Sequence, residues 1–120
     1  METVHMSFDD AATEGVRVLR PSGSIDHEGA AQIERAFQAA AEGADRLVVD
    51  LSDVELMTTP GIAMVLAAAQ RAQGRGGRLV VTGARGFVDD LIRRCKLDAV
   101  LTLADTERDA IRLAKQTGHA

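Results

Sequence analysis

The feature that most constrains the fold is an apolar run near the middle of the chain, Leu47–Leu51. Its residues are apolar except for Asp50, and they do not alternate with polar ones. A strand with this pattern is buried on both faces, which is typical of a parallel sheet covered by helices. Parallel neighbours need long crossover connections, usually helical. We therefore expect an α/β fold built around this strand.

The segment Leu56–Met64 joins that strand to an apolar helix expected to end at Gly74. Thr59 can act as the helix N-cap, because its side-chain oxygen can accept from a backbone N–H that has no helical partner. Pro60 would then take the first helical position, where its missing N–H costs nothing. Two adjacent hydroxyls at a strand–helix joint make this segment the candidate functional site.

Strands and helices alternate along the rest of the chain. The patterns predict these elements: a strand at Val4–Phe8, a strand at Val16–Arg20, a helix at His27–Glu42 capped by Asp26, a strand at Leu79–Val81, a helix with Phe87, Val88, Leu91, Ile92 and Cys95 on its apolar face, a strand at Val100–Leu103, and a helix capped by Thr106 and Asp109 that ends near Gln116. We expect one α/β domain with a mixed, mostly parallel sheet of about five strands and about four helices. Its core would span residues 4–116, and residues 117–120 would fray.

Composition excludes several function classes. A formal net charge of −4 and three aromatic residues, all Phe, do not suit a nucleic-acid binder. No apolar run approaches the ~20 residues that a membrane-spanning helix needs. The start of the chain lacks a signal-peptide pattern, and the single Cys95 cannot form an internal disulfide. We expect a cytoplasmic protein that neither binds nucleic acid nor inserts into a membrane.

Residues able to carry catalysis or hold a metal are sparse. The three histidines are far apart and lack partners at metal-site spacing, and Cys95 is expected to be a buried, inert thiol. The loop Gly83–Gly86 lies between a strand and a helix, but it lacks the P-loop lysine and the dinucleotide fingerprint. We expect no enzyme, no metal and no cofactor. A small nucleotide-binding protein or enzyme that uses this loop and Asp26 is the weakest alternative.

The helix after Pro60 is apolar on a face that a surface helix usually makes charged. The residues expected to face inward are Ile62, Val65, Leu66, Ala69 and Ala72. The opposite face carries Pro60, Met64, Ala67 and Ala68. A helix packed between two layers would explain these residues, but we favour an exposed patch that a partner covers.

Several motifs in register resemble the STAS domain family, the fold of bacterial anti-sigma factor antagonists. Gly23–Asp26 resembles the family's Gly-x-Leu-Asp segment, and Leu47–Leu51 with Asp53 resembles its central strand and acidic loop. Met57–Gly61 stands where the family has Met-Asp-Ser-Ser-Gly or Met-Asp-Ser-Thr-Gly. Gly76–Val81 matches the Gly-Gly lead into the next strand. The resemblance covers nearly the whole chain.

The resemblance implies a protein partner. In antagonists of this family, the first Ser of the motif is phosphorylated by an anti-sigma factor that is also a serine/threonine kinase of the GHKL type, and a PP2C-type phosphatase can reverse this. Thr59 matches the phosphoacceptor, with Thr58 as second choice. Thr58 also replaces the family's Asp, and Pro60 replaces its second Ser or Thr. The expected partner-binding residues are Asp26, Thr58, Thr59, Pro60, Gly61, Met64, Ala67 and Ala68.

Two functions of this kind are open. The first is an anti-sigma factor antagonist that phosphorylation switches off at the start of the second helix. The second is a STAS scaffold subunit of a stress-signalling or lipid-transport complex, either unphosphorylated or phosphorylated on threonine.

Overall fold

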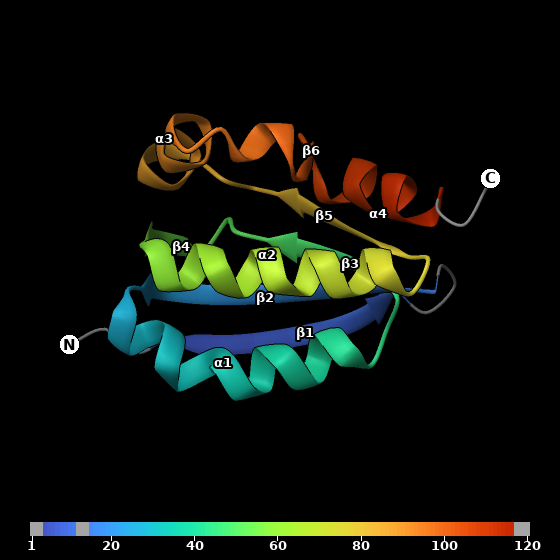
Figure 1. The fold of residues 1–120 in the computed structure, drawn as a ribbon, viewed down its shortest axis with the longest axis horizontal. Helices are drawn as coiled ribbons and strands as arrows, with labels where there is room; N and C mark the ends of the chain where they lie inside the picture. Colours follow the sequence, from blue (N-terminus) through green and yellow to red (C-terminus); the bar gives the residue numbers. More distant parts are fainter. Residues whose placement is uncertain (1–3, 12–14, 117–120) are drawn as a thin grey trace.

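The computed structural model describes residues 4–11 and 15–116, which form one sheet with helices on both faces (Figure 1). The strands are β1 (His5–Ala11), β2 (Val16–Ile25), β3 (Arg46–Asp50), β4 (Val54–Met57), β5 (Arg78–Thr82) and β6 (Thr102–Ala104). The helices are α1 (His27–Glu42), α2 (Thr59–Gly74), α3 (Gly86–Arg94), α4 (Glu107–Lys115) and a 3-10 turn at Leu97–Ala99. The predicted tail at 117–120 lies outside the described residues.

The sheet is mixed and mostly parallel, as predicted. Its strand order is β1-β2-β3-β5-β6, and β4 pairs with the far end of β2. Only the β1–β2 pair is antiparallel among the described pairings. β3 lies at the centre, and its Leu47, Val48 and Val49 are fully buried. The prediction of a doubly buried central strand is therefore confirmed.

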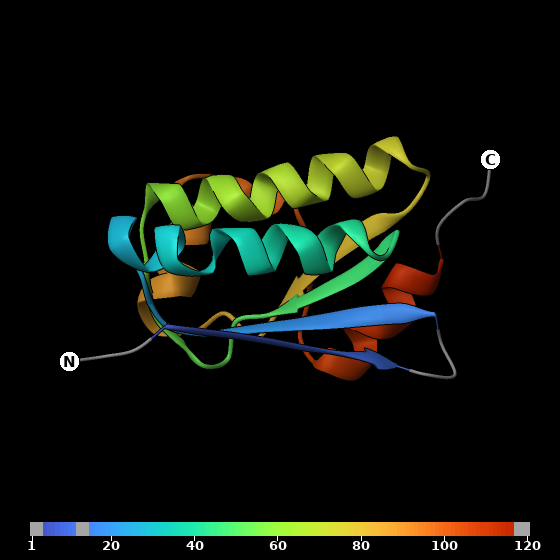
Figure 2. The same ribbon diagram turned by 90° about the horizontal axis from the view of Figure 1, so that it is seen from below.

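Helices cover the two faces of the sheet unequally. Figure 2 shows α1 and α2 side by side on one face and α4 on the other. The core beneath α1 and α2 contains Leu47 and Val49, whereas Val48 packs with Val80 and α4's Ala110 in a smaller cluster. Alternate residues of β3 thus enter different cores, which is why the run needs no polar alternation.

Helix α1 agrees with the sequence prediction. The Asp26 carboxylate accepts a hydrogen bond from the Gly29 N–H at 2.8 Å, so Asp26 is the N-cap. The helix ends before Gly43. The predicted inward residues are all buried: Ala30, Ile33, Phe37, Ala40 and Ala41.

Strand β4 was not predicted, and β2 is longer than predicted. β2 pairs with β3 through residues 17–19 and with β4 through residues 23–25. Pro21, which cannot donate to a ladder, lies between these two pairings. β2 therefore continues past its proline, and the added strand brings the sheet to six.

The predicted apolar face of α3 is only partly correct. Val88 and Ile92 are buried, but Phe87 is 76% exposed and Cys95 is also exposed. The helix is short and ends at Arg94, so Cys95 no longer follows the helical stripe. The expectation of a buried Cys95 thiol is wrong. Val100 is likewise exposed, and β6 begins two residues after it.

Helix α4 begins as predicted, with the Thr106 hydroxyl accepting from the Asp109 N–H at 3.1 Å. Across the residues that the structure describes, no helix is both long and apolar enough to cross a membrane.

Candidate functional site

The joint between β4 and α2 is built around Thr58. Its N–H donates to the Ile25 carbonyl oxygen at 3.1 Å, and its hydroxyl lies 3.5 Å from the same oxygen. Its backbone is extended, and its own carbonyl accepts from the Ile62 N–H at 3.1 Å. Thr58 is therefore the residue at the N-cap position, although its side chain makes no capping bond.

The prediction that Thr59 is the N-cap is wrong. The bonds of Thr58 to Ile25 fix the end of β4, so the helix begins one residue earlier than expected. Thr59 is the first helical residue, and Pro60 is the second rather than the first. A proline is tolerated there because the first four N–H groups of a helix have no intrahelical partner.

The Thr59 side chain is accessible. The residue is exposed, and none of the hydrogen bonds found among the described residues engages its hydroxyl. A hydroxyl with no structural duty at a helix N-terminus can be modified without removing a cap. An anion there would also be favoured by the helix dipole.

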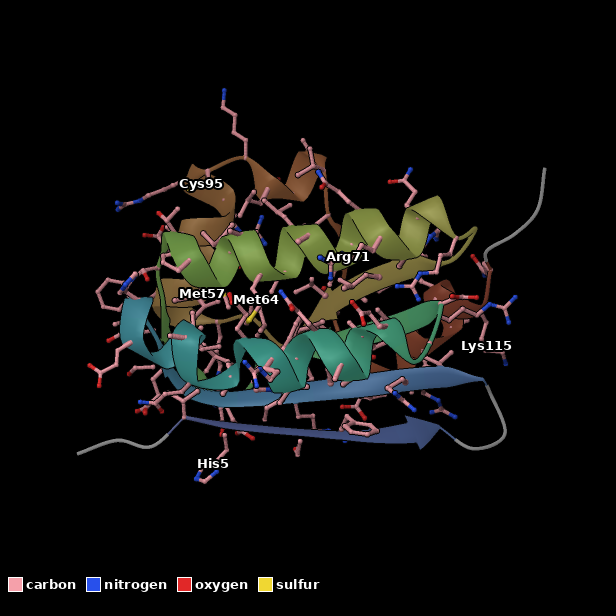
Figure 3. The ribbon with its side chains drawn as sticks, turned by 60° about the horizontal axis from the view of Figure 1, so that its bottom comes forward. His5, Met57, Met64, Arg71, Cys95 and Lys115 are labelled. Atoms are coloured by element: carbon pink, nitrogen blue, oxygen red, sulfur yellow. The ribbon has the colours of Figure 1, made fainter. Side chains whose placement is uncertain are left out.

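The four residues Pro60, Met64, Ala67 and Ala68 were expected to form an exposed apolar patch on α2, and this expectation is wrong for two of them, which are buried. Met64 is only 8% exposed and Ala68 only 4%, while Pro60 and Ala67 are half-buried. The reason is tertiary: α1 packs against α2, and Figure 3 shows Met64 between the two helices.

The buried side of α2 is therefore rotated toward α1. Of the predicted inward stripe, Val65 and Ala72 are buried, but Ile62, Leu66 and Ala69 are half-buried. The exposed residues of α2 nearest the joint are Thr59 and Ala63.

Gly61 and Asp26 are brought to the same edge of the sheet as the two threonines. Ile25 pairs with Met57, which places Asp26 beside Thr58. A Cβ at Gly61 would lie 2.8 Å from Ile25 Cγ2 and 2.9 Å from Met57 Cγ. Gly61 is buried and allows α2 to approach the strands closely, so its role is in packing. Asp26, Thr58, Thr59 and Pro60 thus form the joint site of this chain.

The loop Gly83–Gly86 ends at the same edge but is not suited to phosphate. The cleft beside it, about 370 Å³, is lined by Arg85 and Arg93 but also by Asp89 and Asp105. Arg93 is already paired with Asp89 at 3.1 Å, and that hydrogen bond raises the pKa of the arginine. The described residues contain no cluster of metal-binding side chains.

Two accessible features of this end of the molecule were missed from the sequence. Phe87, at the start of α3, was assigned to the interior but is the most exposed large apolar side chain described. Arg85 donates to the Ser52 carbonyl oxygen at 3.0 Å and so ties the β5–α3 loop to the β3–β4 loop. The local sequence predicts neither the exposure of Phe87 nor the bond of Arg85 to Ser52, because both depend on how segments distant in the sequence pack together.

Comparisons with known proteins agree with this geometry. The family model described as "Mlab, STAS domain" matches residues 8–103. No curated protein sequence matches the chain significantly.

Solved structures resemble the chain over almost its full length. An anti-sigma factor antagonist from Mycobacterium paratuberculosis is 29% identical, with a TM-score of 0.84 over 95% of this chain and 96% of that one. A putative antagonist from Thermotoga maritima is 17% identical, with a TM-score of 0.82 over 92% and 95%. The phosphorylated form of the Bacillus cell fate determinant SpoIIAA is 21% identical, with a TM-score of 0.66 over 91% and 98%. The matched domain, the strand order and the joint between β4 and α2 together show that the chain belongs to the STAS domain family.

Proposed function

We propose that this STAS domain is a regulatory binding module that acts as an anti-sigma factor antagonist in the cytoplasm and has no enzymatic activity of its own. The observation that carries the proposal is the accessible Thr59 hydroxyl at the first position of α2. It matches the phosphoacceptor of the family motif. The similar structures named as anti-sigma factor antagonists support the same function.

The partner would be an anti-sigma factor that is also a GHKL-type serine/threonine kinase. It would contact the joint site, Asp26, Thr58, Thr59 and Pro60, and continue along α2 over Ala63 and the half-buried Ala67. Met64, Ala68 and Gly61 would support this surface from below, because they are buried.

Phosphorylation of Thr59 would weaken binding to the partner without unfolding the domain. A phosphate adds roughly −1.5 to −2 charges. At a helix N-terminus an anion is favoured by about 0.3–1 kcal/mol, and no cap is lost because Thr59 caps nothing. In the complex, the same charge would be desolvated at the interface, which costs several kcal/mol when it has no partner. A PP2C-type phosphatase would restore binding.

A STAS scaffold that needs no phosphorylation is the second candidate function. The observation that favours it is Pro60, which removes the backbone N–H directly after Thr59. A kinase that positions its substrate through that N–H would not accept this chain.

Partner capture and phosphosite mapping test the proposal together. The protein would be used to isolate bound proteins, and then incubated with the captured kinase and ATP. Phosphate should appear on Thr59, disappear in Thr59→Ala, and remain in the matched variant Thr58→Ala. Capture of transporter or stress-complex subunits without phosphorylation would contradict the antagonist and support the scaffold.

A further inference from the structure

A cleft of about 370 Å³ lies where the chain leaves the last two strands of the sheet, β5 and β6. After β5 the chain enters α3, whose Val88 and Ile92 join the core beneath α1 and α2. After β6 it enters α4, whose Ala110 packs on the opposite face of the sheet. The two connections therefore diverge at the carboxyl ends of neighbouring parallel strands, which is where open α/β sheets commonly place their ligand clefts.

The two walls of this cleft stand close together at its base. Thr82 and Ala104 are paired in register, so Asp105 follows beside Gly83, about one strand spacing of ~4.8 Å away. Arg85 comes two residues further along the β5 side. The volume lies toward the lower end of the range for small-molecule sites, so the cleft suits a molecule of few atoms.

In the described part of the chain, one cation and one anion of the cleft have no ion-pair partner. Arg93 and Asp89 pair with each other at 3.1 Å. Arg85 is exposed and donates to the Ser52 carbonyl oxygen, but it forms no ion pair with Asp105 or with another described residue. The Asp105 carboxylate is also exposed, and none of the hydrogen bonds or ion pairs found among the described residues engages it. A ligand that carries both charges could bridge the two side chains.

The floor between these two charges is apolar, since Val81, Ile92 and Leu103 line it. Val81 and Ile92 are buried and Leu103 is half-buried, so the apolar surface that faces the cleft is small. A short apolar side chain would cover it. A phosphate group would instead meet the Asp105 carboxylate as well as Arg85, and like charges placed together at a binding site are costly.

We propose that this cleft binds a small zwitterion of the α-amino acid class, with its carboxylate on Arg85, its ammonium group on Asp105 and a short apolar side chain over Leu103. Arginine suits the first contact, because its planar guanidinium can donate two parallel bonds to a carboxylate. The ionised carboxylate of Asp105 only accepts hydrogen bonds, which suits an ammonium group with three donors. The proposal goes beyond the proposed function and does not depend on it, because neither Arg85 nor Asp105 belongs to the joint site.

Titration of the isotope-labelled full chain with L-valine, followed by NMR, tests the site. The amide signals of Gly83, Ala84 and Asp105 should shift and saturate, whereas those of Thr58 and Thr59 should not move. N-acetyl-L-valine lacks the ammonium group and L-valinamide lacks the carboxylate. Each should therefore bind about two- to fivefold more weakly than L-valine, which is the size of one exposed ion pair.

Three variants separate the two contacts. Asp105→Asn should weaken L-valine about two- to fivefold and leave N-acetyl-L-valine unchanged, because the acetylated ligand has no cation for Asp105 to bind. Arg85→Gln should weaken L-valine by a similar factor and leave L-valinamide unchanged, and Arg85→Lys should restore binding because it keeps the charge. Asp98→Asn removes an exposed carboxylate that does not line the cleft, so it is the matched control and should bind like the wild type.

Two results would overturn the site. One is the absence of a saturable shift in the cleft with L-valine. The other is an Asp105→Asn variant that weakens L-valine and N-acetyl-L-valine alike, because a loss common to both ligands would report an altered structure and not a lost contact with the ammonium group. If Arg85→Gln does not fold, Asp105→Asn with the three ligands decides instead.

Discussion

Replacing Met64 by Asp should unfold the protein or nearly so, because this side chain lies between α1 and α2 (Figure 3). Removal of a buried Met side chain alone, as in Met64→Ala, costs about 2–5 kcal/mol. An unpaired carboxylate in the same position adds a desolvation penalty of several kcal/mol. The total free energy of unfolding of a domain of this size is about 5–15 kcal/mol, so the two penalties together can exceed it.

The matched control is the preceding residue of the same helix. Ala63 is exposed, so Ala63→Asp introduces the same charge on the other side of α2 and should change stability by no more than about 0.5 kcal/mol. Thermal denaturation followed by circular dichroism compares the two. For a chain of this length, each kcal/mol shifts Tm by roughly 3–6 °C, so a loss of about 2–5 kcal/mol should make Met64→Ala melt about 6–30 °C below the wild type.

Equal melting temperatures for Met64→Asp and Ala63→Asp would refute the placement of α2. They would show that Met64 reaches solvent and that α1 does not cover it. The same pair also tests the proposed interface, since Ala63→Asp should weaken partner binding while leaving the fold intact.

Three further outcomes are expected. In urea denaturation, Gly61→Ala should lower the free energy of unfolding by about 1–3 kcal/mol, because the new Cβ would lie 2.8 Å from Ile25 Cγ2. The control Gly74→Ala should not lower it, because its Cβ would have no neighbour within 4 Å outside its own helix among the described residues. Thr82→Val should leave the free energy of unfolding unchanged or raise it by up to about 1 kcal/mol in the same assay, because the buried Thr82 hydroxyl has no hydrogen-bond partner among the residues that the structure describes; a clear loss of stability would reveal an unseen hydrogen bond. Thr59→Glu should keep the wild-type Tm or raise it slightly, and a large decrease would show that Thr59 does have a structural duty.

The parts of the fold that are set by local patterns could be predicted from the sequence. α1 shows both its Asp26 cap and its apolar spacing within a few residues, and α4 shows its Thr106 cap. The doubly buried β3 could be identified because its lack of alternation requires helices on both sides.

The parts that depend on distant contacts could not be predicted. An alanine-rich helix such as α2 has several apolar faces, and only the position of α1 decides that Met64 and Ala68 face inward. The start of α2 depends on the Ile25 carbonyl, which lies 33 residues from Thr58 in sequence. The contact between Arg20 and Glu107 joins residues 87 positions apart, so no periodicity signals it.

The bond between Thr58 and Ile25 explains how one joint can be both rigid and open to modification. It fixes the ends of β2 and β4 relative to each other, and Gly61 lets α2 pack closely on the same two strands. The structural contacts at the joint are therefore made by residues on either side of Thr59, and none of the hydrogen bonds found among the described residues engages the Thr59 hydroxyl. A change of charge on that hydroxyl alters the surface that a partner meets and leaves the underlying strands in place.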